Sequence, residues 1–258
     1  MLQQERLAHI VSLVREHRFC SVQQLARWAN VSQATIRRDL LALSQNDQVR
    51  LTRGGAMSVP EGTFQEPAYE IKYNLHLDEK IRIGREACRH IRAGETLLLD
   101  TGTTVLQMAI AMNEQQNDWQ NLTVATNDLR TACELSRIPS LSLHMLGGVV
   151  RKGHYTTMGC WTQTALDTLH ADKGFLSCDA VDIASGLTIT NVEEVAIKQS
   201  MLQAASERIL LCDHAKFQAA AFMRLCSLER IQRIITGREL SEDIVAQFRE
   251  AGIDMVLV

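Results

Sequence analysis

Residues Ser21 to Ala56, SVQQLARWANVSQATIRRDLLALSQNDQVRLTRGGA, decide the architecture of the N-terminal part of this 258-residue chain. Ser21 and Ser32 are each followed by a helical pattern, and a serine hydroxyl at such a position can accept a hydrogen bond from a free N–H group of the first turn. A short break at Asn30-Val31 separates the two patterns. The stretch therefore predicts two helices joined by a tight turn, followed by a small β-wing from Val49 to Gly55.

The second predicted helix has one apolar face and one polar face. Ile36, Leu40 and Leu43 recur at i, i+4 and i+7, so they share the face that packs on the core. The polar face offers hydroxyl, amide and guanidinium groups that suit the major groove of DNA. With an arginine of the wing that can meet phosphate, the candidate DNA-binding residues are Ser32, Gln33, Thr35, Arg37, Arg38 and Arg53.

An amphipathic helix pair with a solvated, arginine-rich face is the simpler alternative. The length of the turn, the Arg37-Arg38 doublet at the front of the helix and the basic wing disfavour it. Before these elements, Met1 to His17 has the apolar spacing of a supporting helix. We expect Trp28 to lie in the core that these helices form.

The order and spacing of these features resemble the DeoR family of bacterial transcription regulators. The resemblance rests on VSQATIRRDLLAL at 31–43 and VRLTRGGA at 49–56. The family's motif has the form S-x-x-T-I-R-R-D-L, followed by a basic wing with two glycines. The resemblance implies a winged helix-turn-helix domain that binds double-stranded operator DNA.

Charge is distributed unevenly along the chain. Residues 1–56 contain eight arginines and four acidic residues, a net charge of +4; because the whole chain carries −3, the remainder carries −7. A basic N-terminal module on an acidic body indicates nucleic-acid binding at one end only. The excess is modest for a monomer, so we expect a homo-oligomer, a dimer or tetramer, that combines half-sites.

Composition excludes several classes of protein. The sequence has no apolar run of 18 residues and no signal-peptide pattern, so we expect a cytoplasmic protein without membrane contact. Seven scattered cysteines disfavour a disulfide framework or a zinc site, and most have apolar neighbours typical of buried thiols. The eight histidines have no metal-ligand spacing, and we expect neither a metal nor a cofactor.

Two of the three prolines fall between Met57 and Tyr69, a stretch without periodicity. We therefore expect a winged helix-turn-helix domain at 1–56, a linker and connecting segment at 57–78, and a C-terminal domain at 79–258. In the last of these, short apolar runs alternate with helical patterns. This alternation predicts an α/β, Rossmann-like fold with a mostly parallel sheet.

Polar residues follow several of the predicted strands, where ligands of such sheets bind. Asp100-Thr101-Gly102-Thr103-Thr104 lies between a strand and a helix, a pattern that fits a phosphate-binding turn and an ordinary helix cap equally well. The spacing is that of neither a P-loop nor a dinucleotide motif. Asn127-Asp128 and Gly147-Gly148 end the next two strands, although they are also ordinary turn residues.

Charged residues occur in the second half of the chain as well. Glu194 and Lys198 are four residues apart on a predicted helix, which is better explained by a surface ion pair than by a binding site. Lys216 follows a strand and comes three residues after Asp213. It is the stronger candidate for holding an anion.

The order of these motifs, DTGTT, TND, LGG, ADK-x-F, GLT, E-x-x-x-K and DHAKF, is similar to the sensor domain of the same family, to the end of the chain. The resemblance implies a domain like ribose-5-phosphate isomerase that binds a phosphorylated sugar, which releases a repressor from its operator. By this resemblance, the phosphate contacts are Asp100, Gly102, Thr103 and Thr104, and the sugar contacts are Asn127, Gly147, Asp179, Glu193 and Lys216.

We therefore expect a DNA-binding regulator, most simply a repressor of a carbohydrate-utilisation operon, and not an enzyme. The alternative is an isomerase-like enzyme fused to a DNA-binding module, with Glu193 as the base and Lys216 stabilising negative charge. The family's D-x-S-K carries Ala215 here, and its D-G-I-D carries Ala180. Both changes weaken catalysis more than binding. Binding without an effector, or activation in place of repression, remains a third possibility.

Overall fold

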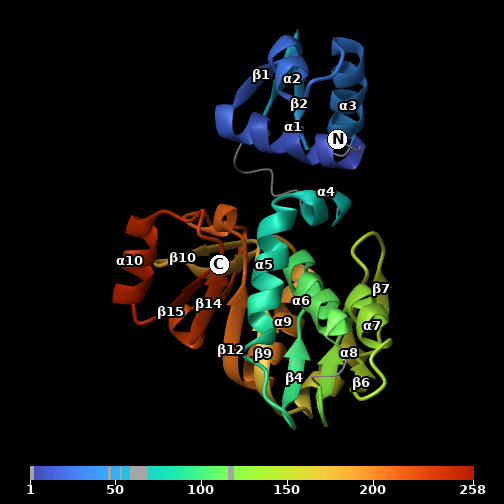
Figure 1. Ribbon diagram of the computed structural model, residues 1–258, viewed down its shortest axis with the longest axis vertical. Helices are drawn as coiled ribbons and strands as arrows, with labels where there is room; N and C mark the ends of the chain where they lie inside the picture. The colour runs from blue at the N-terminus through green and yellow to red at the C-terminus, as the bar shows by residue number, and fades with distance from the viewer. Residues whose placement is uncertain (1–2, 46–47, 53, 59–68, 116–118) are drawn as a thin grey trace. The chain divides into compact units, whose positions relative to one another are not determined.

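The computed structural model describes residues 3–45, 48–52, 54–58, 69–115 and 119–258. The chain forms two compact units, Met1–Leu77 and Asp78–Val258, which are coloured blue to cyan and cyan to red in Figure 1. The boundary between them lies inside segment 57–78, which the sequence predicts to be a linker and connecting segment.

The first unit contains the predicted pair of helices and wing. Helix α1 (Gln3–His17) and strand β1 (Phe19–Ser21) come first, then α2 (Val22–Trp28) and α3 (Gln33–Gln45), and finally β2 (Arg50–Thr52) and β3 (Gly55–Met57). The three strands form an antiparallel sheet in the order β1-β3-β2. Asn30, in the turn before α3, has a φ of 51°, a left-handed conformation that asparagine tolerates better than most residues.

Local hydrogen bonds explain where the helices begin. Ser21 and Gln24 form a reciprocal capping box at the start of α2: the Ser21 hydroxyl accepts from the Gln24 N–H, and the Gln24 side chain accepts from the Ser21 N–H. At the start of α3, the Ser32 hydroxyl accepts a hydrogen bond from the Thr35 N–H at 3.1 Å. Both capping roles agree with the sequence prediction.

The core of the first unit extends beyond the predicted domain boundary. Ile10, Leu25, Ile36 and Leu40 are buried together, and Ile71 of α4 (Tyr69–Asn74) joins the same cluster. Helices α1 and α4 are in contact. Within segment 57–78, α4 is therefore part of the first unit rather than only a connection.

The prediction that Trp28 lies in this core is wrong. Its side chain is 43% exposed, and its ring stacks on that of His17 with the ring centroids 5.1 Å apart. Leu25 lies on the buried face of the short helix α2, and Ala29, the residue that caps the end of this helix, is buried as well. Trp28 instead contacts the C-terminal end of α1.

The second unit is built on a seven-stranded sheet in which every neighbouring pair is parallel (Figure 1). Its strand order is β15-β14-β12-β9-β4-β5-β6. The strands are β4 (Thr96–Leu99), β5 (Thr123–Thr126), β6 (Ser142–Met145), β9 (Ala171–Leu176), β12 (Ala205–Leu211), β14 (Arg233–Thr236) and β15 (Asp254–Leu257). This confirms the predicted Rossmann-like α/β fold. The strand order reverses between β4 and β9, which is where such folds form a ligand crevice.

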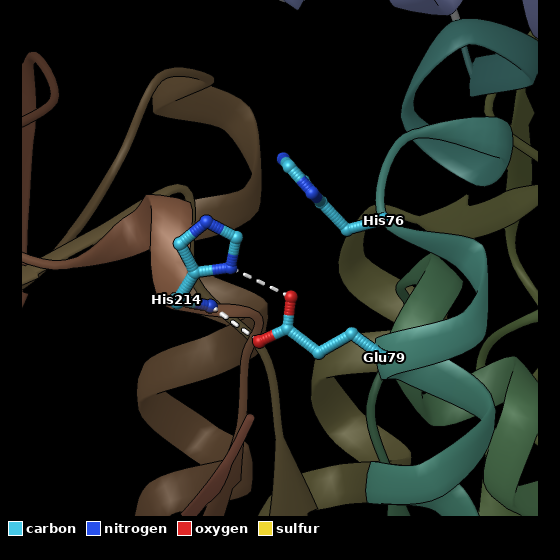
Figure 2. Close-up of side chains that lie close together, drawn as sticks. All are labelled: His76, Glu79 and His214. Atoms are coloured by element: carbon cyan, nitrogen blue, oxygen red, sulfur yellow. Dashed lines mark hydrogen bonds and ion pairs between the residues drawn. The ribbon is translucent and has the colours of Figure 1, made fainter. Parts of the chain in front are cut away.

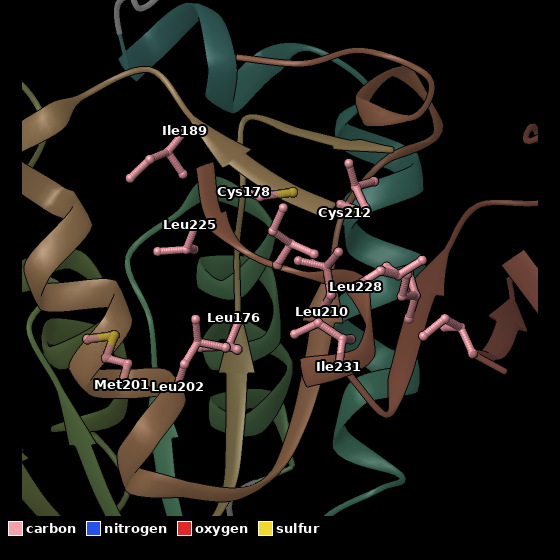
Figure 3. Packing of buried hydrophobic residues seen from close by; sticks show 14 of the residues in the cluster. Leu176, Cys178, Ile189, Met201, Leu202, Leu210, Cys212, Leu225, Leu228 and Ile231 are labelled. Atoms are coloured by element: carbon pink, nitrogen blue, oxygen red, sulfur yellow. The ribbon is translucent and has the colours of Figure 1, made fainter. Parts of the chain in front are cut away.

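Helices cover both faces of this sheet. Helices α5 (Leu77–Cys88), α6 (Thr103–Glu114) and α7 (Leu129–Leu135) contribute to one buried cluster, together with Leu97 and Leu99 of β4. Helices α8 (Cys160–Asp167), α9 (Val192–Ala204) and α10 (Glu242–Glu250) contribute to the other, which contains Leu98 and is drawn in part in Figure 3. The alternation along β4 follows from the two-residue period of a strand.

Smaller elements decorate the ends of the sheet. Strands β7 (Val149–Arg151) and β8 (Thr156–Met158) form an antiparallel hairpin, and β10 (Ala180–Asp182), β11 (Gly186–Ile189) and β13 (Met223–Cys226) form a second antiparallel sheet. Two 3₁₀ turns, η2 (His214–Lys216) and η3 (Leu228–Arg230), follow β12 and β13. In the described ranges, the helices all lack the combination of length and apolarity that crossing a membrane requires.

Candidate functional sites

The polar face predicted for α3 is present. Gln33, Arg37 and Arg38 are exposed, and Thr35 is half-buried. The Ser32 hydroxyl forms hydrogen bonds within the first turn of α3: it lies 3.1 Å from the Thr35 backbone nitrogen and 2.9 Å from the Thr35 hydroxyl. Ser32 is therefore placed to position the helix, while the other four side chains are presented from it.

Sequence reasoning missed the partner of Asp39, which lies between the exposed arginines and the buried Leu40. The Asp39 carboxylate is buried and receives two hydrogen bonds from Arg6 of α1, from Nε at 2.6 Å and from Nη2 at 3.3 Å. This pair joins α3 to α1 and raises the pKa of the Arg6 guanidinium, mainly through the hydrogen bond. It fixes the helix that carries Arg37 and Arg38.

The wing depends on a close backbone approach. A Cβ on Gly55 would lie 2.2 Å from the carbonyl oxygen of Cys20, so only glycine fits where β3 pairs with β1. Gly54 has a φ of 100°, which also favours glycine. Arg50 of β2 is exposed. Arg53 lies outside the described residues.

In the second unit, the Asp100 carboxylate is surrounded by donors. Its Oδ1 accepts from the Thr101 N–H at 2.8 Å, and its Oδ2 accepts from the Ser177 N–H at 2.9 Å, the Ser177 hydroxyl at 3.2 Å and Lys198 Nζ at 2.5 Å. Asp100 follows β4 and Ser177 follows β9, so this cluster lies where the strand order reverses. With its oxygens occupied by the protein, Asp100 acts as a positioning residue for the loop that follows it.

The expectation that Lys198 forms a surface pair with Glu194 is wrong. Lys198 is buried and forms its ion pair with Asp100, whereas Glu194 pairs with Arg151 of β7 at 2.6 Å. Burial is the largest influence and lowers the pKa of Lys198, but the charges of Asp100, Glu194 and Asp179, together with the hydrogen bond to Asp100, outweigh it, so the net shift is upward. Spacing along one helix could not reveal a partner 98 residues earlier in the chain.

The loop after Asp100 opens helix α6. Gly102 is the residue before the helix and has a φ of 143°; a Cβ there would lie 2.9 Å from the Ser177 side chain. Gly102 supplies no side-chain cap, so the first N–H groups of α6 are not satisfied in that way. Thr103 and Thr104, the next two residues, are buried.

Asn127 and Asp128 follow β5, and Asp128 contacts the same loop. The Thr101 hydroxyl donates to Asp128 Oδ2 at 2.9 Å, and Asp128 also caps α7 by accepting from the Thr131 N–H at 2.7 Å. Burial raises the pKa of Asp128, and the Thr131 hydrogen bond partly offsets this. Asn127 Nδ2 donates to Thr156 and Thr157 of β8, while its buried Oδ1 has no hydrogen-bond partner among the described residues.

The glycine pair after β6 also lies at this edge of the sheet. The Thr157 hydroxyl bridges Asn127 to the carbonyl of Leu146, directly before Gly147. A Cβ on Gly147 would meet nothing within 4 Å, but one on Gly148 would lie 2.3 Å from the Thr162 hydroxyl. Steric fit therefore requires glycine at position 148, and position 147 has space beside it.

Asp179, Glu193 and Lys216 are the remaining predicted effector residues. Asp179, after β9, accepts from the Thr190 N–H at 2.8 Å and contributes to the field that raises the pKa of Lys198. Glu193 is exposed on the first turn of α9, and Lys216 is half-buried at the end of η2. Lys216 follows β12, two strands along the sheet from Asp100.

The ADK motif at 171–173 lies elsewhere. It begins β9, so it occupies the end of the sheet opposite to the Asp100 loop. There Lys173 pairs with Glu95, and Asp172 accepts from the Thr96 N–H at 2.8 Å. These contacts join β9 to the start of β4.

A further buried polar cluster was not predicted. Glu79, on the first turn of α5, accepts hydrogen bonds from the backbone N–H groups of His214 and Gly237. Its other oxygen lies 2.7 Å from His214 Nδ1, and Figure 2 shows both contacts with His214. The adjacent Lys80 pairs with Asp213 at 3.8 Å. Charged residues of an amphipathic helix are usually predicted to face solvent, so the sequence does not indicate that Glu79 and Lys80 are buried.

Comparison with known proteins agrees with both halves of this description. The DeoR-like helix-turn-helix domain matches residues 6–61, and the DeoR C-terminal sensor domain matches residues 75–238. The fold and the helix-turn-helix surface thus define a two-domain transcriptional regulator with a DNA-binding module and an α/β sensor. The chain belongs to the DeoR family.

Relatives that match this chain over nearly its whole length are named as transcriptional regulators or repressors. The chain is 29% identical to the HTH-type transcriptional repressor GlcR of Bacillus subtilis, with 100% of this chain and 97% of that protein covered. It is 31% identical to the HTH-type transcriptional regulator GlpR of Haloferax volcanii (99% and 98% covered), and 30% identical to the transcriptional repressor AccR of Agrobacterium fabrum (96% and 95%). The protein is a DNA-binding transcriptional regulator of a family that is regulatory rather than enzymatic.

Solved structures are less similar. Ribose 5-phosphate isomerase from Plasmodium falciparum has a TM-score of 0.39 and 14% identity, covering 54% of this chain and 52% of that one. The eIF2B delta subunit from Chaetomium thermophilum has a TM-score of 0.41 and 14% identity, covering 83% and 74%.

Proposed function

We propose that this regulator represses a carbohydrate-utilisation operon and that a phosphorylated sugar releases it from the operator. The observation that carries the effector half is the loop from Asp100 to Thr104. The Asp100 carboxylate is held by protein donors, Gly102 has a positive φ, and helix α6 starts directly after it without a side-chain cap from Gly102. A helix start of this kind binds anions through its N–H groups and dipole.

The neighbouring groups suit the neutral part of a sugar phosphate. Asn127 Oδ1 is a buried acceptor with no partner among the described residues, so a ligand hydroxyl would satisfy it. Gly147 leaves open space at the end of the next strand. Asp179, Glu193 and Lys216 complete the proposed effector set. Asp100 supports the phosphate loop rather than contacting the anion, because two negative charges would repel each other.

On the DNA side, we assign base contacts to Gln33 and Thr35, and base or phosphate contacts to Arg37 and Arg38. The arginines are exposed at the front of α3, and a guanidinium can bind guanine or phosphate through two parallel hydrogen bonds. Ser32 positions the helix. The phosphate contact that the sequence predicts for Arg53 stays a prediction. A dimer or tetramer would join two or more of these surfaces on successive half-sites.

Release requires a difference in affinity. The sensor must bind the sugar phosphate more tightly in the arrangement that cannot hold the operator, since equal affinity for both arrangements would not shift the equilibrium between them.

The isomerase-like alternative needs Glu193 as a base. The regulatory names of the full-length relatives favour regulation over turnover.

The test is a fluorescence anisotropy titration of labelled DNA from upstream of the protein's own gene, at fixed salt concentration. D-ribose 5-phosphate, D-glucose 6-phosphate and D-fructose 1-phosphate are then added, each with its free sugar as the matched control. Release by one phosphate and not by its free sugar supports the proposal. Tight, specific binding that no phosphate reverses would overturn the effector half and leave the DNA-binding function.

A further inference from the structure

The first turn of α5 is held by what we call the α5 latch, which consists of Glu79, Lys80, Asp213, His214 and Gly237. Glu79 Oε1 lies 2.7 Å from the His214 N–H nitrogen, and Oε2 lies 2.7 Å from His214 Nδ1 (Figure 2). Oε1 also lies 3.1 Å from the N–H nitrogen of Gly237. Glu79 and Lys80 are both buried. Hydrogen bonds to a buried carboxylate are strong and directional, so the latch fixes the position of this turn.

One side of the latch is continuous with the proposed effector site. Asp213 caps the η2 turn by accepting a hydrogen bond from the Ala215 N–H at 3.2 Å, and its carbonyl accepts from the Lys216 N–H at 3.1 Å. Lys216, one of the proposed effector contacts, is therefore tied to Asp213 and His214 within a single short turn. A displacement of the Lys216 backbone would act on those two residues through this turn.

The other side of the latch is where the chain enters the second unit. The units meet between Leu77 and Asp78, so Glu79 and Lys80 are the second and third residues of the second unit. Any shift in the first turn of α5 acts directly on the covalent connection to the DNA-binding unit. Few other positions in the second unit lie so close to this connection along the chain.

We propose that the α5 latch transmits the effector signal: an anion that draws on Lys216 moves the η2 turn, which moves the first turn of α5 and the chain leading to the DNA-binding unit. This inference rests on the proposed function, because it requires an effector that releases DNA. A latch that served only as an anchor would affect stability, but it would leave the coupling between effector and operator unchanged.

The test measures three quantities separately in the full-length protein: operator affinity without effector, affinity for the sugar phosphate that releases the wild type in the titration above, and the factor by which saturating effector weakens operator binding. The variant is Glu79→Gln, which keeps the size of the side chain but removes its charge. The matched control is Glu86→Gln on the same helix, where Glu86 pairs with the exposed side chain of Arg89.

We expect Glu79→Gln to keep both affinities within about threefold of wild type and to reduce the coupling factor by about tenfold, within the usual range of allosteric couplings. Glu86→Gln should behave like wild type in all three. Gly237→Ala provides a second perturbation, because its methyl group would lie 2.2 Å from Glu79 Oε1. Unchanged coupling in a folded Glu79→Gln or Gly237→Ala protein would overturn the latch proposal alone.

Hydrogen exchange of the wild-type protein supplies a readout that needs no variant. Saturating effector should change the exchange of amides 78–82 as well as those around Lys216. No change at 78–82, in a protein that the effector releases from DNA, would overturn the latch. If no panel compound releases the wild type, the proposed function fails and this inference fails with it.

Discussion

Asp100 Oδ2 and Lys198 Nζ are 2.5 Å apart, in a buried ion pair that joins the end of β4 to helix α9. The pair lies at the reversal of strand order, beside Ser177 and directly before the loop that opens α6. Its geometry makes Asp100 the support of the proposed phosphate loop, and it gives Lys198 a structural role that the sequence did not suggest.

Removing one member of this pair should be strongly destabilising. Lys198→Met leaves the Asp100 charge buried without its cation, and we expect a loss of about 3–5 kcal/mol in the free energy of unfolding. Urea denaturation measures it, with Lys152→Met at an exposed lysine as the control. The double variant Asp100→Asn/Lys198→Met should lose less than Lys198→Met alone; an equal or larger loss would contradict the pairing.

The two glycines after β6 should respond differently to a methyl group. Gly148→Ala brings Cβ to 2.3 Å from the Thr162 hydroxyl and should cost about 1–3 kcal/mol of stability through overpacking. Gly147→Ala, its neighbour and matched control, has open space and should stay within about 0.5 kcal/mol. Thermal unfolding distinguishes them, and equal melting temperatures would be incompatible with the observed packing.

The Arg6–Asp39 pair should stabilise the DNA-reading helix. Arg6→Gln removes the charged donor of a buried carboxylate, and we expect a loss of about 1.5–3 kcal/mol. Arg27→Gln, at an exposed arginine of α2, is the stability control. Denaturation is monitored by Trp28 fluorescence in a Trp119→Phe/Trp161→Phe background, in which the remaining tryptophan lies in this unit. If Arg6→Gln unfolds at the same denaturant concentration as wild type, the pair contributes nothing.

The exposed arginines of α3 should contribute to operator affinity without contributing to stability. Arg38→Gln should weaken operator binding by about 1–3 kcal/mol while leaving the melting temperature unchanged. Anisotropy at two salt concentrations separates the roles: a phosphate contact lowers the salt dependence for every sequence, and a base contact relaxes discrimination at one position. Arg89→Gln, whose side chain is 78% exposed in the second unit, is the control; if it weakens binding equally, α3 is not the reading surface.

The Glu79–His214 contact should make stability depend on pH. Its hydrogen bond raises the pKa of His214 above the ordinary value of 6.5, although burial opposes the shift. The contribution of this contact to the free energy of unfolding is therefore fully present below pH 6.5, and it is lost as the pH rises through the pKa that His214 has in the folded protein. The difference in unfolding free energy between wild type and His214→Gln should shrink from pH 6 to pH 9. Exposed His170→Gln should show no such trend; a difference that grows with pH would reverse the assignment.

The sequence by itself determined the local features of this protein. Helix caps at Ser21 and Ser32, the i, i+4, i+7 face of Ile36, Leu40 and Leu43, and the alternation of strands and helices all depend on residues that are close along the chain. The family motifs are local in the same sense. These features were enough for the winged helix-turn-helix module, the parallel sheet and the class of function.

The tertiary structure decided which distant residues meet. Lys198 is four residues from Glu194, but its partner is Asp100. Trp28 is a large apolar residue of the kind found in cores, but it is exposed and stacks on His17. Glu79 and Lys80 have the sequence pattern of solvent-exposed residues, but they are buried against the loops after β12 and β14. Helical spacing records which side chains share a face, and it does not record what that face meets. Long-range pairing depends on strand order and on helix placement, which no local pattern in a single sequence encodes.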